Sequence, residues 1–296
     1  MDHNNASGPS GSAMGHTGIL SILDVATGYK MTYLVRSKSE EETTYNLKRF
    51  KGRHKVVAMY CDRAPELAAS AANIGAPCDH SIPGRSQTNS LTERCNHDIN
   101  RGTRAALVQA GFPPAFWHLA CQHYCMMDNT TGPESPWYKK NREYFDGLRI
   151  PFGAKVHFMP TPTSSVGRDL PKMAPSLVPG VFVGYEVNVG GRWTGGYLCI
   201  ARAELDGLPL LVQGDPKLQR VHVQATKEVR LVSGVLEATD EGAATEGGGA
   251  CSPTTEGRPD TGGDGRTTGG ASSSTVAPPK SSGARDVWFS HTSSSI

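Results

Sequence analysis

The chain lacks the features that mark membrane proteins and small disulfide-rich proteins. No apolar run approaches the roughly 20 residues that a bilayer-spanning helix needs. The seven cysteines are an odd number without Cys-x-x-Cys pairs, and no signal peptide precedes them. We therefore expect reduced thiols in an intracellular protein, rather than a disulfide framework, and no membrane partner.

An excess of charge of one sign is also missing. Lys and Arg number 30 against 28 Asp and Glu, which gives a net charge of +2. Any binding of nucleic acid must therefore depend on where the charges lie. The 296 residues and the hydrophobic fraction of 37% are ordinary for a soluble globular protein with one large or two modest domains.

Cysteine and histidine crowd one segment, at His118, Cys121, His123 and Cys125. Zinc sites usually need four ligands that converge from two places in the chain. This segment is an apolar helical stretch without a second ligand pair, so no zinc site is predicted in this chain.

Residues 1–149 alternate between strand and helix patterns, which predicts an α/β fold with a mixed sheet flanked by helices. Several helices have capping residues or proline at their expected starts. The expected strands are 19–25, 29–35, 54–61 and 80–83, and the expected helices are 39–50, a helix opening at Pro65, 88–109 and 114–127.

Residues 150–236 change to short β-like pieces separated by Gly and Pro turns, which predicts a small β-rich module. Its expected strands are 154–159, 180–187, 195–201, 208–212 and 221–231. Residues 237–296 are rich in Gly, Ser and Thr and predict a disordered tail. Val287, Trp288 and Phe289 form its last apolar cluster, either a docking motif or incidental.

Asp62 directly follows the apolar run HKVVAMYC, so a carboxylate is expected at the C-terminal end of a strand. Open α/β sheets usually bind their ligands at that edge. The alternative is a surface residue beside Arg63.

A set of motifs resembles the catalytic core of copia-type, retroviral-like integrases, which are parts of retrotransposon Pol polyproteins. PGRSQTNSLTER (83–94) resembles the family's segment around its third acid, with Ser90 in place of Gly. YCDRAPEL (60–67) resembles the block around the second acid but lacks its Asn-Gly pair. ILDVATGY (22–29), FWHLA (116–120), PFG (151–153) and GVFVGY (180–185) follow the family's order. The resemblance covers about residues 1–231.

The resemblance implies an RNase H-like fold and a metal-binding catalytic triad of Asp2, Asp62 and Glu93. Three carboxylates suit Mg²⁺ or Mn²⁺, and two ions would clamp the attacking and leaving oxygens of a phosphodiester. The implied activity is DNA integration, by processing of element ends and strand transfer into target DNA. Homo-oligomers and nuclear localisation during integration are implied as well.

The first acid of the triad has two candidates. Asp24 ends an apolar strand, but in the resemblance it falls on the second strand, after the catalytic position. Asp2 lies 60 positions before Asp62, where the first acid belongs. Only Met1 precedes Asp2, so the strand that should carry it has no residues, and we expect an N-terminally truncated core with weak or no strand transfer.

Nucleic-acid contacts are expected beside Glu93. Arg94, His97, Arg101 and Arg104 recur at spacings of three or four, which places them along one side of a helix. The preceding loop contributes Arg85, Gln87 and Asn89. The alternative is an ordinary solvated helix face.

Three alternatives remain open for the site and the function. Ser90 to Glu93 is also a capping-box pattern, so Glu93 could simply cap its helix. The chain could be an inactive remnant that keeps the fold and binds nucleic acid. A ribonuclease H is the third reading, because one fold serves several activities.

Overall fold

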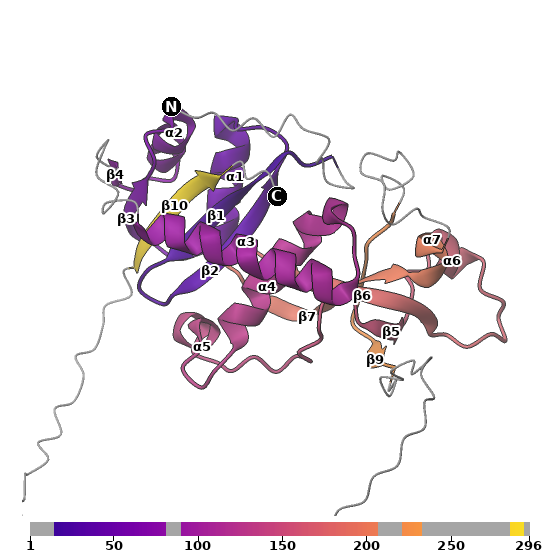
Figure 1. Cartoon of the computed structure of the whole chain (residues 1–296). Helices are drawn as coiled ribbons and strands as arrows, with labels where there is room; N and C mark the ends of the chain where they lie inside the picture. The colour runs from indigo at the N-terminus through magenta and orange to yellow at the C-terminus, as the bar shows by residue number, and fades with distance from the viewer. Residues whose placement is uncertain (1–14, 81–89, 207–220, 233–284, 293–296) are drawn as a thin grey trace, which may run out of the picture. The chain divides into compact units, whose positions relative to one another are not determined.

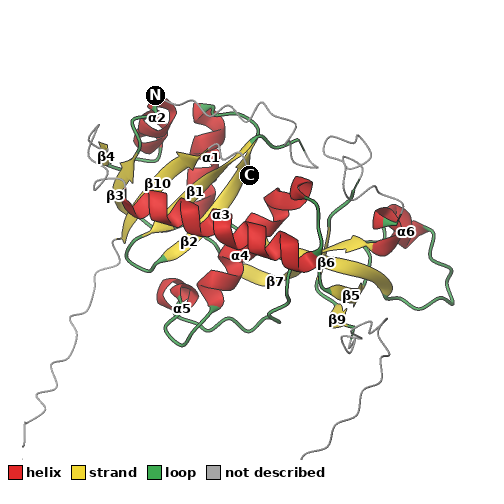
Figure 2. Ribbon diagram, viewed as in Figure 1, coloured by secondary structure: helices red, strands yellow, loops and turns green. Residues whose placement is uncertain are grey.

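The structure, a computed structural model, describes residues 15–80, 90–206, 221–232 and 285–292 (Figures 1 and 2). These residues belong to one compact unit. Among them, no helix is long and apolar enough to cross a membrane. The helices are α1 (Glu40–Lys51), α2 (Pro65–Asn73), α3 (Ser90–Ala110), the 3-10 helix η2 (Pro114–Phe116), α4 (Trp117–Thr130), α5 (Pro136–Asn141), α6 (Ser165–Arg168) and α7 (Arg202–Leu205).

In the part of the chain that the structure describes, the strands form two sheets of five. The first sheet has the order β2-β1-β10-β3-β4 and the second has the order β8-β7-β6-β5-β9. The strands are β1 (Gly18–Asp24), β2 (Tyr29–Val35), β3 (Val56–Cys61), β4 (Cys78–His80), β5 (Lys155–Phe158), β6 (Val178–Val187), β7 (Trp193–Ala201), β8 (Gln224–Thr226), β9 (Val229–Leu231) and β10 (Arg285–Thr292).

The first sheet is mixed, as the sequence predicts. β1 pairs antiparallel with both β2 and β10, whereas β10, β3 and β4 run parallel to one another. The carboxyl ends of these three parallel strands therefore meet at one edge of the sheet.

Helices pack against both faces of this sheet. The contacts of β2 show this, since successive side chains of a strand point to opposite faces. Tyr29 and Tyr33 contact Phe50 of α1 on one face. On the other face, the Thr32 hydroxyl donates a hydrogen bond to Cys121 Sγ of α4. Figure 1 shows α3 running across the sheet as a long helix.

The second sheet is antiparallel. Its buried residues belong to the same hydrophobic core as those of α4 and of the first sheet. His123 Nε2 lies 2.9 Å from the Ile150 carbonyl oxygen, and the Ile150 amide donates to the Tyr185 hydroxyl of β6 at 3.0 Å. The expected boundary between 149 and 150 separates the two sheets but does not separate two compact units.

Most expected elements appear within a few residues of their predicted bounds. The strand predicted at 54–61 begins at Val56, and the piece predicted at 80–83 is Cys78–His80, with residues 81–83 outside the described part of the chain. The strand predicted at 208–212 also lies outside it. The short helix α5, with its Ser135 cap, was not predicted.

One expectation about the tail is wrong. Residues 237–296 were expected to be disordered throughout, but Arg285–Thr292 form β10 in the middle of the first sheet. β1 and β3 would each leave one row of backbone groups unpaired, and a strand between them satisfies both rows. The apolar cluster of Val287, Trp288 and Phe289 is thus part of a strand.

Candidate metal and nucleic-acid site

Asp62 lies at the edge where the parallel strands end. It follows β3 directly and its side chain is exposed to solvent. Its Oδ1 accepts a hydrogen bond from the Arg63 backbone amide at 2.7 Å, which holds the carboxylate at the strand terminus. Asp62 therefore lies at the C-terminal end of a strand, as the sequence predicts, and its role as a ligand stays a prediction.

Glu93 lies in the first turn of α3, and its side chain is also exposed. An acid there is favoured by the helix dipole without any catalytic role. The capping-box alternative stays open. The helix α3 begins at Ser90, and the residue that precedes it lies outside the described residues. The predicted nucleic-acid contacts Arg85, Gln87 and Asn89 also lie outside the described residues.

The proposed triad is not assembled among the described residues. Asp2 lies outside them, and neither Asp62 nor Glu93 belongs to a described group of three or more His, Cys, Asp or Glu side chains with close ligand atoms. The assignment of Asp2, Asp62 and Glu93 as metal ligands therefore remains a prediction.

Asp24 has a structural role, because both of its carboxylate oxygens accept hydrogen bonds within the β1–β2 turn. The side chain is only 2% exposed. Its Oδ2 accepts a hydrogen bond from the Thr27 hydroxyl at 2.7 Å, and its Oδ1 accepts one from the Ala26 amide at 3.2 Å. Asp24 thus closes the turn between β1 and β2, a usual use of Asp.

The cationic side chains expected on α3 share one face. Arg94, His97, Arg101 and Arg104 are all exposed. They extend over about 15 Å of helix at 1.5 Å per residue. The described part of the chain therefore contains a row of basic side chains on the same helix as Glu93.

A cleft of about 430 Å³ adjoins this row at the junction of α3 with β1 and β2. At its base, Lys30 forms ion pairs with Asp98 and, at 2.9 Å, with Asp128. Burial alone would raise the pKa of Asp98, but its hydrogen bonds with Lys30 and Tyr124 and the nearby charges of Lys30 and Arg101 together lower it. The lining residues are Leu23, Gly28, Lys30, Leu91, Arg94, Cys95, His97, Asp98 and Arg101.

The histidines and cysteines of α4 serve the core. Burial lowers the pKa of His118 to about 3 and that of His123 to about 4. His118 Nδ1 lies 3.1 Å from the Ala115 carbonyl oxygen. Cys121 donates to the His118 carbonyl oxygen, and Cys125 is fully buried. These four residues form no metal-binding group in the described structure.

Sequence reasoning missed a cluster of soft ligands at the ends of β3 and β4. Cys61 Sγ lies 2.9 Å from Cys78 Sγ and 3.5 Å from His80 Nδ1. Burial, together with the neighbouring Cys78 thiol, raises the pKa of the Cys61 thiol well above its usual range. The Cys-x-His spacing at 78–80 was a signal, but only the pairing of β3 with β4 joins it to Cys61.

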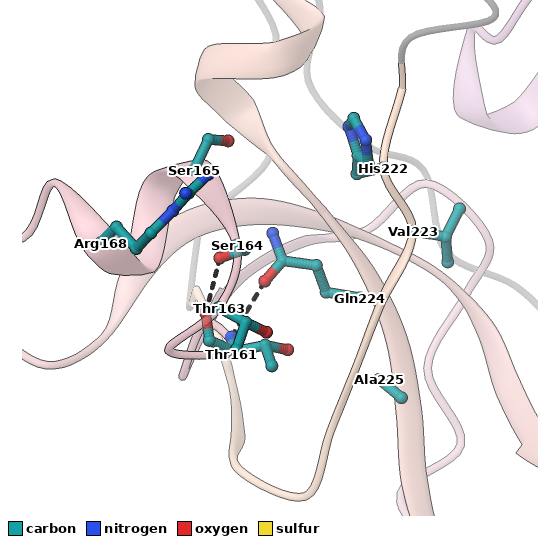
Figure 3. A pocket seen from close by; sticks show the side chains of 9 residues that line it. All are labelled: Thr161, Thr163, Ser164, Ser165, Arg168, His222, Val223, Gln224 and Ala225. Carbon is teal, nitrogen blue, oxygen red and sulfur yellow. Dashed lines mark hydrogen bonds between the residues drawn. The ribbon is translucent and has the colours of Figure 1, made fainter.

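A second cleft, of about 570 Å³, lies in the β-rich part (Figure 3). Gln224 Oε1 accepts a hydrogen bond from the Thr161 amide at 3.0 Å, while its buried Nε2 has no partner among the described residues. Arg168 and His222 are exposed at the rim. No residue that the sequence singled out lies there.

Comparisons with known proteins leave the family open. No family model matches the chain, and no curated protein matches it. Among solved structures, the catalytic core domain of BIV integrase superposes with a TM-score of 0.33 and 15% sequence identity. The match covers 40% of this chain and 82% of that domain. A TM-score of 0.33 is too low to carry an argument about fold or function.

Proposed function

We propose that this chain is the nucleic-acid-binding, Mg²⁺-dependent polynucleotidyl transferase core of a retrotransposon integrase. The observation that carries the proposal is the arrangement on α3. Glu93 shares one helix with the row of basic side chains Arg94, His97, Arg101 and Arg104. A phosphate backbone bound along that row would therefore pass beside the carboxylate.

The residues available near this surface suit a hard divalent cation. Asp62 and Glu93 offer exposed carboxylate oxygens, which Mg²⁺ prefers, and Asp2 would complete the set. When bound, two such ions stabilise the attacking and leaving oxygens of an in-line phosphoryl transfer. Arg94 and Arg101 would hold the phosphates in register through charge-assisted hydrogen bonds.

A second function is nucleic-acid binding without catalysis. In the family pattern the first acid belongs to a central strand, whereas the central strand described here is β10. Its one acid, Asp286, pairs in register with Ala58, four positions before Asp62. This observation favours a protein that binds DNA through α3 without a complete triad of its own.

The test compares DNA joining and DNA binding in one set of proteins. The full chain is incubated with labelled duplex ends and target DNA, with Mg²⁺ or with EDTA. We expect a low, Mg²⁺-dependent yield of joined product that is lost in Asp62→Asn and Glu93→Gln. Glu41→Gln, an exposed acid in the first turn of α1, and Asp146→Asn are the matched controls.

The outcomes separate the two functions. Binding without any joined product would overturn the transferase and support the second function. Product that survives in Asp62→Asn and Glu93→Gln would show that these acids are not the metal ligands. An absence of both binding and product would overturn both functions.

A further inference from the structure

Three side chains with soft ligand atoms converge where β3 and β4 end, at the edge of the first sheet. The Sγ atoms of Cys61 and Cys78 and a ring nitrogen of His80 all lie within 4.8 Å of one another. Cys61 is buried, Cys78 is half-buried and His80 is exposed. The cluster therefore has a closed inner side and an outer side that solvent can reach.

The backbone itself brings these residues together. β3 and β4 are parallel, with Met59 opposite Cys78 and Cys61 opposite His80. Because side chains alternate along a strand, Cys61, Cys78 and His80 all project from the same face of this strand pair. Two strands fix the cluster, so it does not depend on the rotamer of a single flexible residue.

The distances can be compared with a tetrahedral zinc site. With Zn–S near 2.3 Å and Zn–N near 2.0 to 2.1 Å, tetrahedral angles require S···N of about 3.6 Å and S···S of about 3.8 Å. The Cys61 Sγ to His80 Nδ1 distance of 3.5 Å already fits. The two Sγ atoms, 2.9 Å apart, would need to separate by about 1 Å, which a rotation of half-buried Cys78 can supply.

The chemistry of the ligands selects the kind of ion. Thiolate and imidazole suit Zn²⁺, whereas Mg²⁺ prefers oxygen. The cluster is therefore distinct in preference from the exposed carboxylates, although Asp62 directly follows Cys61 in the chain.

We propose that Cys61, Cys78 and His80 bind one Zn²⁺-type cation and that this site fixes the end of β3 from which Asp62 extends. Three protein ligands leave a fourth position for water. Zinc binding at this edge does not depend on the proposed transferase activity, so the two can fail separately. The bound ion would join β4, an edge strand of three residues, to its neighbour.

The experiment uses the full chain, purified under reducing conditions and freed of metal by a chelator. Co²⁺ replaces Zn²⁺ as a spectroscopic probe, because thiolate ligands give an intense charge-transfer absorption and tetrahedral coordination gives strong visible bands. We expect both signals to saturate at one Co²⁺ per chain and to vanish when Zn²⁺ is added. Native mass spectrometry should then show one bound zinc.

Substitutions assign the ligands. Cys78→Ser and His80→Asn should each weaken Co²⁺ binding by at least about tenfold, and Cys78→Ser should also halve the charge-transfer intensity per bound Co²⁺. Cys95→Ser, a half-buried cysteine on α3 outside the cluster, is the matched control and should bind as the unaltered chain does. Both test positions are more exposed than Cys61, so these variants should still fold.

Two results would overturn the proposal. The first is the absence of charge-transfer absorption, or an absorption that Cys78→Ser and His80→Asn leave unchanged. The second is a Cys61–Cys78 disulfide in the reduced preparation, seen as the loss of two titratable thiols without metal uptake. Either result would leave the cluster as a pair of packed thiols beside a surface histidine.

Discussion

Two buried histidines of α4 make the stability of this protein depend on pH. Burial lowers the pKa of His118 to about 3 and that of His123 to about 4, so both are neutral in the folded chain. In the unfolded chain a histidine titrates near pH 6.5. The unfolded state therefore binds more protons in this interval, and stability falls as the pH drops below about 6.5 toward about 4.

We expect the free energy of unfolding to decrease by about 1.4 kcal/mol per pH unit for each histidine in that interval. Urea titrations between pH 7.5 and 4.5 would measure it. His118→Asn and His123→Gln replace the ring with a neutral amide near the same donor atom, and each should flatten the slope. Equal slopes in the variants and the unaltered chain would mean that other groups cause the acid sensitivity.

Asp24 provides a second residue-scale prediction, because its carboxylate is buried and accepts two hydrogen bonds in the β1–β2 turn. Asp24→Ala should cost about 1.5 to 3 kcal/mol of stability, the range for hydrogen bonds to a charged group. Asp24→Asn keeps an acceptor oxygen and should cost less. A stable Asp24→Ala protein that binds DNA but has lost all Mg²⁺-dependent joining would instead place Asp24 in the active site.

The candidate site could be predicted from sequence only where the signal is local. Asp62 at a strand end and the exposed row on α3 follow from short apolar runs and helical spacing. The Cys61, Cys78 and His80 cluster could not, because the pairing of β3 with β4 creates it across 17 positions. The group at 118–125, which is crowded in sequence, instead packs in the core.

At the scale of elements, β10 is the strand on which the first sheet depends. It pairs with β1 on one side and with β3 on the other, so it supplies both halves of the sheet with their central hydrogen bonds. Proline at Trp288 would fix the φ angle and remove a backbone N–H in a central strand, so the sheet would lose a ladder hydrogen bond. We expect Trp288→Pro to lower the melting temperature in thermal unfolding.

Hydrogen exchange gives the more specific readout for β10. Amides of β1 and β3 should lose protection in Trp288→Pro, whereas those of β6 and β7 in the second sheet should change little. Lys172→Pro, at an exposed turn position outside both sheets, is the control and should leave the exchange of β1 and β3 unaltered. Full protection of β1 and β3 in Trp288→Pro would mean that the sheet does not need this strand.

Elements with a strong local pattern could be predicted, and those set by distant partners could not. β2 begins and ends at the predicted residues, because Tyr29 to Val35 is a β-prone run after a glycine turn. β10 was missed because its apolar residues stand in a polar tail, and only the open places beside β1 and β3 make it a strand.

At the scale of the whole molecule, α4 connects the two sheets into one unit. Asn129 is fully buried and exchanges two hydrogen bonds with the backbone of Lys30 in β2, at 3.0 and 2.6 Å. At the other side of the helix, His123 contacts Ile150 and stacks on Tyr185 of β6. The two sheets should therefore unfold together in a single transition.

The charge of the whole chain determines how DNA binding must be tested. With a net charge of only +2, the DNA binding that we propose must depend on local charges such as the row on α3. Each phosphate contact of that row should contribute about 0.9 to the slope of log K against log salt. Replacing Arg94, Arg101 and Arg104 together by Gln should therefore make the slope shallower by up to about 2.7 units.

The matched control replaces Arg53, Lys55 and Lys172 by Gln. All three are exposed, and the first two lie just before β3, at the end opposite Asp62. Both triple variants lower the net charge by three, so a bulk effect would weaken them equally. If the interface lies on α3, the slope of log K against log salt becomes shallower in the first variant and stays unchanged in the control. Fluorescence anisotropy with labelled DNA at several salt concentrations would measure both slopes.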